Sequence, residues 1–223
     1  MSERRDRSGT DLVSGAANEP SLEPALDALS VPGLLIGHRV ISPGDEGALR
    51  DAEGSSISSS IANVRRASGA ARMVARSLLA QLGYPEAQVP KGAGGAPVWP
   101  VGVVGSLAHD DEIAVAAVGL RRDFASVGID VEWAGELPSD MLALVATQSE
   151  RRRIEDDLVK AKLLFAVKEA VYKAVYPLDR LFLEFGDIEV DLAAGTATTR
   201  SGRTLTLRSC IASHIVALAL VQT

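Results

Sequence analysis

The sequence has 223 residues, of which 47% are hydrophobic, and this is enough apolar material for a folded core. Its 23 Lys and Arg residues against 29 Asp and Glu residues give a formal net charge of -6, which argues against a general nucleic-acid binder. The single cysteine, Cys210, excludes an intrachain disulfide framework and a multi-cysteine metal site.

The first part of the chain lacks the apolar periodicity of a folded segment. Residues 1–30 are rich in Ser, Asp, Glu, Gly and Pro, so we expect a disordered N-terminal arm. The first predicted strand is 34–41, and the Ser-rich stretch 54–60 is predicted to be a flexible loop. Apolar residues at helical spacing then predict a helix over 65–82. This helix carries four basic residues, Arg65, Arg66, Arg72 and Arg76.

The rest of the chain alternates between predicted strands and helices. Two strands flank a turn at 108–111, a strictly alternating strand follows, and two helices and three strands complete the chain. The predicted strands are 101–107, 113–120, 127–132, 188–192, 204–208 and 213–221, and the predicted helices are 138–150 and 156–176. This order predicts an α+β fold with two similar α/β halves, residues 31–120 and 121–223.

No apolar run has the length of an export signal or a membrane span. The longest, 211–221, is about half of the roughly 20 residues that cross a bilayer, and we interpret it as a buried strand. We therefore expect a cytoplasmic protein with no membrane partner and no nucleic-acid partner.

The strand 127–132 brings two carboxylates to one face. Because side chains alternate along a strand, Gly128, Asp130 and Glu132 share a face. Two neighbouring carboxylates repel each other, and a shared Mg²⁺ ion would explain why they converge. A solvated acidic strand face explains the same pattern, so this segment alone leaves both interpretations open.

The predicted helix 156–176 has a charged face beside its apolar stripe. Glu169 and Lys173 are one turn apart, and Lys168 precedes Glu169. A Glu–Lys pair at this spacing is commonly a surface ion pair of small energetic value. In the functional interpretation, Glu169 binds a metal ion or accepts a proton, and the two lysines balance phosphate charge.

The turn that follows the strand 101–107 presents His109. Backbone N–H groups at such a strand end can bind a phosphate group, and Ser106 lies three residues before the histidine. A turn histidine that only satisfies local hydrogen bonds is the alternative. His38 and His214 lie in apolar predicted strands, and we expect structural roles for both.

The three segments become specific when they are taken together and in order. Gly-Ser-x-x-His, Gly-Ile-Asp-Val-Glu and Phe-x-x-Lys-Glu-Ala-x-x-Lys resemble the motifs of the 4′-phosphopantetheinyl transferase superfamily, surfactin-synthetase type. The run Pro97-Val98-Trp99-Pro100 resembles the enterobactin-synthase-like branch. The resemblance extends from about Arg39 to Leu192. It implies two pseudo-symmetric halves in one chain, with the active site in the cleft between them, and a monomer.

The resemblance implies a Mg²⁺-dependent enzyme of siderophore, nonribosomal peptide or polyketide biosynthesis. Such an enzyme moves phosphopantetheine from coenzyme A to a serine of an apo acyl- or peptidyl-carrier protein and releases adenosine 3′,5′-bisphosphate. The metal ligands would be Asp130, Glu132 and Glu169, in the second half of the chain, and the catalytic residues Glu169 and Lys173. The residues that bind coenzyme A would be Ser106, His109, Lys168, Lys173, Arg72, Arg65 and Arg66, with Arg72 the first choice among the arginines.

Two positions depart from the pattern of many relatives. Ala108 and Ala166 stand where those relatives have serine, so one phosphate contact beside His109 is missing. The metal and lysine positions are retained, and we expect an active enzyme. Two alternatives remain: a Mg²⁺-dependent phosphodiesterase or pyrophosphohydrolase that degrades coenzyme A, and a non-catalytic carrier-protein binder.

Both expected substrates are anions, and the negative net charge would oppose their approach. The densest basic run, Arg151–Arg153 followed by Lys160 and Lys162, is therefore a hypothesis for a carrier-docking surface. A solvated helix face is the alternative for such a charge run.

Overall fold

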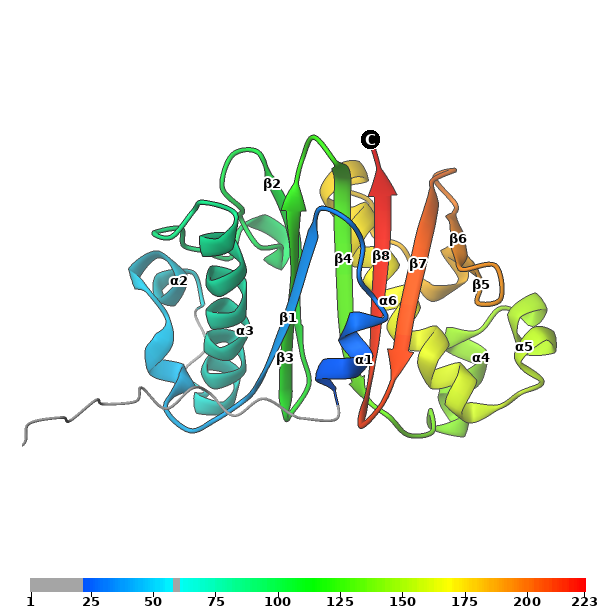
Figure 1. Ribbon diagram of the computed structural model, residues 1–223. Helices are drawn as coiled ribbons and strands as arrows, with labels where there is room; N and C mark the ends of the chain where they lie inside the picture. Colours follow the sequence, from blue (N-terminus) through cyan, green and yellow to red (C-terminus); the bar gives the residue numbers. More distant parts are fainter. Residues whose placement is uncertain (1–21, 58–60) are drawn as a thin grey trace, which may run out of the picture.

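A computed structural model describes residues 22–57 and 61–223 of the chain. It has an α+β fold with two antiparallel sheets, each covered by a long helix (Figure 1). The three-stranded sheet has the order β1-β3-β2, and the five-stranded sheet has the order β4-β8-β7-β6-β5. The strands are β1 (Leu34–Val40), β2 (Val103–His109), β3 (Ile113–Leu120), β4 (Phe124–Trp133), β5 (Ile188–Asp191), β6 (Thr196–Thr199), β7 (Thr204–Ile211) and β8 (His214–Gln222). The helices are α1 (Glu23–Asp27), α2 (Asp51–Ser56), α3 (Ala62–Gln81), α4 (Leu142–Val145), α5 (Gln148–Ile154) and α6 (Leu158–Asp179), and the 3-10 turns are η1 (Asp45–Ala48), η2 (Ala93–Gly95), η3 (Ser139–Met141) and η4 (Phe185–Asp187).

The three-stranded sheet and the β4-β8-β7 part of the five-stranded sheet share one pairing pattern. In each, the first strand in sequence pairs antiparallel with the last, and the last strand forms a hairpin with the strand before it. A long helix, α3 or α6, lies between the first strand and the next one in the chain.

Alternation along the strands separates the core into layers. Val127, Ile129 and Val131 of β4 pack with β3 residues in a cluster that joins the two sheets. The opposite face of the five-stranded sheet packs on α6, and α3 packs on the outer face of the three-stranded sheet. The predicted division of β4 into an apolar face and a face with Gly128, Asp130 and Glu132 is thus confirmed.

Gly128 allows α6 to lie unusually close to β4. A Cβ atom at this position would be 1.9 Å from the carbonyl oxygen of Ala170 and 2.7 Å from the nitrogen of Ala174. No other residue fits without moving the helix, since such distances are far inside van der Waals contact. The absence of a side chain at Gly128 therefore determines how near the functional groups of α6 come to Asp130.

The start of the chain differs from the prediction. Residues 1–21 of the expected arm lie outside the described residues, but Leu22, Leu26 and Leu29 are buried in the cluster that joins the sheets. The short helix α1, which contains Leu26 and is flanked by the other two leucines, contacts β1 and β7. The expected disorder is therefore wrong for residues 22–30, where three leucines in eight residues bury enough apolar surface to order the segment.

Two further predictions need correction, and one strand was missed. Residues 54–56 belong to α2 and are not a loop, whereas 58–60 lie outside the described part. The predicted helix 138–150 is divided into η3, α4 and α5, because Thr147 and Glu150 form a capping box that starts a new helix. Strand β6 was not predicted, since its four residues are too few for a periodic signal.

In the ranges that the structure describes, no helix combines the length and apolarity of a membrane span.

Candidate active site

The acidic face of β4 and the basic side of α6 meet at an ion pair. Lys173 Nζ donates to Asp130 Oδ1 at 2.6 Å and to the Ile129 carbonyl at 3.3 Å. Asp130 is buried, and burial raises its pKa to about 6, although the ammonium of Lys173 acts in the opposite direction. Its second oxygen, Oδ2, is buried and has no hydrogen-bond partner among the described residues. A buried carboxylate oxygen without a donor is suited to contact a cation.

Glu132 and Glu169 complete the group of carboxylates around Asp130. Glu132 forms an ion pair with Lys162 of α6. Burial raises the pKa of the half-buried Glu169, Lys173 opposes this, and the charge of Glu132 raises the pKa further. The charges of Glu132 and Glu169 also raise the pKa of Asp130. Hence the three acidic side chains lie within electrostatic range of one another.

The chemistry of these side chains fits a hard divalent cation, because carboxylate oxygens are the ligands that Mg²⁺ prefers. The unpartnered Oδ2 of Asp130 supports this fit. Nevertheless, within residues 22–57 and 61–223 no group of three acidic, histidine or cysteine side chains is arranged as a metal site. Two of the carboxylates are instead neutralised by lysines, Asp130 by Lys173 and Glu132 by Lys162.

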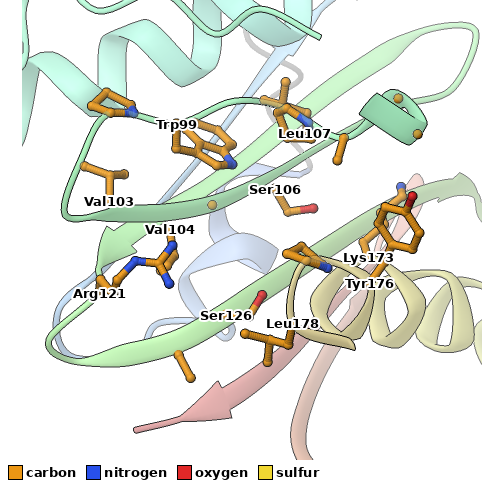
Figure 2. Close-up of a pocket in the computed structure, with 18 of the residues that line it drawn as sticks. Trp99, Val103, Val104, Ser106, Leu107, Arg121, Ser126, Lys173, Tyr176 and Leu178 are labelled. Atoms are coloured by element: carbon orange, nitrogen blue, oxygen red, sulfur yellow. The ribbon is translucent and has the colours of Figure 1, made fainter. Parts of the chain in front are cut away.

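A cavity of about 600 Å³ lies beside this group of charges. Its walls come from the segment 94–107, the start of β4 and the end of α6. Figure 2 shows Ser106 of β2 and Ser126 of β4 on opposite walls, with Arg121 at one end and Lys173 at the other. Because Lys173 lines the cavity and also binds Asp130, the cavity adjoins the carboxylates.

His109 was predicted in the turn after the strand; in the structure it is the last residue of β2, and it is exposed. Desolvation by nearby protein atoms nevertheless lowers its pKa, and the positive charges of Lys173 and Arg72 lower it further. His109, Lys173 and Arg72 therefore lie within electrostatic range and together provide positive potential for an anion. Ser106, the second residue predicted in this motif, is buried in the wall of the cavity.

The arginines of α3 already have protein partners. Arg72 is buried and donates to the carbonyls of Val89 at 2.8 Å and Ser68 at 3.1 Å. Arg65 donates to the Ile57 carbonyl, and Arg66 forms an ion pair with Glu46 at 3.0 Å. Arg76 forms an ion pair with the fully buried Glu53. Of the four, the structure brings Arg72 into range of His109, and it gives the others partners in the N-terminal part of the fold.

Lys168 does not point into the site. Its side chain is fully buried and donates to Glu150 at 2.7 Å and to the carbonyls of Val145 and Phe185, both at 2.9 Å. The predicted role of Lys168 in binding coenzyme A is therefore wrong for this structure. On a helix, adjacent residues project about 100° apart, so the side chain of Lys168 is fully buried while its neighbour Glu169 is half-buried, although both border a second cavity of about 470 Å³.

The basic run 151–162 is not a free positive surface. Arg151 pairs with Asp156 at 2.8 Å, Lys160 with Asp157 at 3.8 Å, and Lys162 with Glu132. Arg153 is likewise engaged by acidic residues of β5. These pairs cancel most of the charge on which the docking hypothesis depended, so the run no longer supports a carrier-docking surface.

Sequence reasoning missed most of the cavity wall. Tyr172 and Tyr176 of α6 line it, as do Arg121 and Ser126 near the start of β4. Trp99, part of the run 97–100 that resembles one branch of the family, lies in the same wall. The tyrosines could have been found, because they stand one turn apart on either side of Lys173; Arg121 and Ser126 carry no comparable sequence signal.

Family models match both parts of the chain. One described as the 4′-phosphopantetheinyl transferase N-terminal domain matches residues 52–119, and one described as the 4′-phosphopantetheinyl transferase superfamily matches residues 126–219. The second match contains the carboxylates and Lys173. The chain belongs to the 4′-phosphopantetheinyl transferase superfamily.

Three relatives support this assignment. The chain is 44% identical over 137 residues to the 4′-phosphopantetheinyl transferase Svp of Streptomyces mobaraensis, which is 58% of this chain and 56% of Svp. It is 40% identical to the 4′-phosphopantetheinyl transferase Npt of Nocardia iowensis, over 66% of this chain and 68% of Npt. It is 39% identical to the 4′-phosphopantetheinyl transferase PptT of Mycobacterium tuberculosis, over 60% of this chain and 61% of PptT. The chain thus spans between about half and two thirds of the length of these relatives.

Proposed function

We propose that this protein is a phosphopantetheinyl transferase that moves the 4′-phosphopantetheinyl group from coenzyme A to a serine of an apo acyl- or peptidyl-carrier protein. The observation that carries the proposal is the ion pair between Asp130 and Lys173 within a group of three carboxylates, at the end of a cavity of about 600 Å³. Its support comes from the superfamily matches and from the names of the three relatives.

In the proposed reaction, the serine Oγ attacks the phosphorus atom that carries the pantetheine arm. The new Ser–O–P bond forms while the bond from this phosphorus to the bridging pyrophosphate oxygen breaks, and adenosine 3′,5′-bisphosphate leaves. Glu169 accepts the serine proton, since its raised pKa suits a carboxylate to general base catalysis. Lys173 neutralises the charge that develops on the leaving phosphate, and His109 with Arg72 adds positive potential for the nucleotide phosphates.

A divalent cation is part of the proposal. Asp130, Glu132 and Glu169 would hold Mg²⁺, with the unpartnered Oδ2 of Asp130 as the first ligand. When bound, the ion would screen the pyrophosphate oxygens and make the phosphorus more electrophilic. Glu132 and Asp130 are also paired with Lys162 and Lys173.

The organisation of the chain belongs to the proposal as well. We propose two equivalent halves, 31–120 and 121–223, with the active site in the cleft between them; the common pairing pattern of the two sheets supports this division. The resemblance of 97–100 supports an enterobactin-synthase-like branch, and the family resemblance supports a cytoplasmic monomer. Light scattering during gel filtration tests the monomer.

Intact-protein mass spectrometry tests the function. Purified apo carrier proteins would be incubated with the enzyme, coenzyme A and Mg²⁺, and a gain of one phosphopantetheine mass is expected on a carrier. Omission of the metal should abolish the gain. If coenzyme A is degraded without any carrier being modified, the protein is a hydrolase and the proposal fails. If coenzyme A binds but is neither transferred nor degraded with any carrier of the panel, the protein is a non-catalytic binder and the proposal fails as well.

A further inference from the structure

A buried ion pair joins α6, the helix that carries the proposed catalytic residues, to the neighbouring helix α5. Lys168 of α6 is 0% exposed and Glu150 of α5 is 1% exposed, and their side chains are 2.7 Å apart. Burial lowers the pKa of Lys168, while the hydrogen bond and charge of Glu150 act to keep it protonated. Taking two charges out of water is costly, and a protein keeps such a pair without penalty only where further hydrogen bonds satisfy both groups.

Here both groups are satisfied. The ammonium of Lys168 has three donors, and they go to Glu150 and to the carbonyls of Val145 and Phe185. Oε2 of Glu150 also accepts from the Thr147 backbone N–H at 2.7 Å, and Oε1 accepts from the Val190 backbone N–H at 2.7 Å. The pair thus connects α6 with the end of α4, the start of α5, the turn η4 and strand β5.

The pair acts on the side of α6 opposite to β4. On the β4 side, Gly128 lets the helix backbone approach so closely that a single added Cβ atom would collide with Ala170. Contact with β4 fixes the distance of the helix, and the ion pairs of Lys162 and Lys173 with β4 restrain its rotation from that side through lysine side chains that are partly exposed. Three directed bonds from the fully buried Lys168 restrain the rotation from the other side, because each requires a particular angle at a carbonyl or carboxylate oxygen.

We propose that Lys168 and Glu150 are positioning residues for Glu169. Their buried bonds hold α6 in the rotation that directs the next side chain, Glu169, toward Asp130 and Glu132. Neither side chain lines the cavity beside Asp130 and Lys173. This inference rests on the proposed function, because Glu169 is there the base and a metal ligand.

The test compares one single and one double substitution. Lys168→Met removes the three directed bonds at nearly the same side-chain length, and Lys168→Met/Glu150→Leu also removes the charge that would be left unpaired. An unpaired buried charge costs more than an unpaired backbone group, so the double variant should recover part of the thermal midpoint that the single variant loses, although the backbone N–H groups of Thr147 and Val190 lose their acceptor. Leu205→Ala, in the same core but outside the pair, is the control for destabilisation alone.

The measurements are kcat for transfer, and the affinity for Mg²⁺ of the enzyme saturated with coenzyme A, by isothermal titration calorimetry. We expect both Lys168 variants to lose roughly tenfold to hundredfold in kcat and several-fold in Mg²⁺ affinity, since small misplacements of a catalytic group have effects of this order. The double variant should remain impaired although it is more stable than Lys168→Met. Leu205→Ala should lose stability while the Mg²⁺ affinity of its folded fraction stays unchanged.

Two results would overturn the inference. If the double variant recovers kcat and Mg²⁺ affinity together with stability, the pair has only a structural role. If Lys168→Met keeps both values, α6 needs no such anchor. The failure of the proposed function is distinguishable from either result, because the unsubstituted enzyme would then modify no carrier protein at all.

Discussion

Nε2 of His214, the first residue of β8, lies 3.1 Å from Oδ2 of Asp110 in the turn between β2 and β3. The imidazole is buried, and its Nδ1 lies 3.1 Å from the Ser213 hydroxyl. Oδ1 of Asp110 accepts from two backbone N–H groups of its own turn, at 2.7 Å and 2.8 Å. Asp110 therefore shapes the turn that follows His109 and also attaches it to the other sheet.

This attachment predicts a binding defect. His214→Gln removes the contact between the imidazole and the Asp110 carboxylate, so it should raise the KM for coenzyme A roughly fivefold, which corresponds to about 1 kcal/mol, and should change kcat little. Steady-state kinetics with a saturating carrier protein measures both values. Glu112→Gln is the control, because Glu112 is exposed and lies 3.9 Å from the same imidazole. Equal KM values for His214→Gln and the unsubstituted enzyme would show that the contact does not position His109.

Replacement of Glu169 should stop the chemistry without unfolding the protein. Glu169→Gln keeps the size of the side chain but removes its charge and its ability to accept a proton, so we expect transfer to fall at least about hundredfold, the size typical of general base catalysis. Mass spectrometry of the carrier gives the rate, and circular dichroism checks the fold. Glu136→Gln, at an exposed position, should behave like the unsubstituted enzyme. Full activity of Glu169→Gln would exclude the proposed role.

The close packing of α6 on β4 predicts a stability effect. Gly128→Ala should lower the free energy of unfolding by about 3 kcal/mol, because overpacking of a rigid core costs this much when backbone atoms must move. Urea denaturation measures it. The matched control is Gly186→Ala, since a Cβ atom there would meet nothing within 4 Å and Gly186 does not have a positive φ. An unchanged urea midpoint for Gly128→Ala would mean that the helix is not held against β4 as described.

The leucines around α1 should contribute to stability like any core residue. Leu29 is 0% exposed, so Leu29→Ala should lower the free energy of unfolding by about 3 kcal/mol, the usual cost of removing a buried leucine side chain. Asp27→Ala, at an exposed position of the same segment, should have little effect. If both variants unfold at the same urea concentration, residues 22–30 are dispensable for the fold, as expected of a disordered arm.

Much of the candidate site could be predicted from the sequence, because its signals are local. A period of two places Asp130 and Glu132 on one face of a strand, and helical spacing places Glu169 one turn from Lys173. The strand–helix–strand order likewise predicts the α+β class. These features depend on residues that are close in the chain, and there the backbone geometry alone determines which side chains face the same way.

The tertiary structure decided what each charged group is bound to. Lys168 and Lys173 are equally basic in the sequence, yet one is buried against Glu150 and the other meets Asp130, 43 residues before it. Segments distant in the chain also determine what surrounds the other groups. Arg72 of α3 donates to the carbonyl of Val89, the leucines around α1 pack on strands of both sheets, and the cavity is lined by residues of 94–107, β4 and α6. Burial and ion pairing arise from packing between elements, and packing depends on the whole set of contacts rather than on any local pattern.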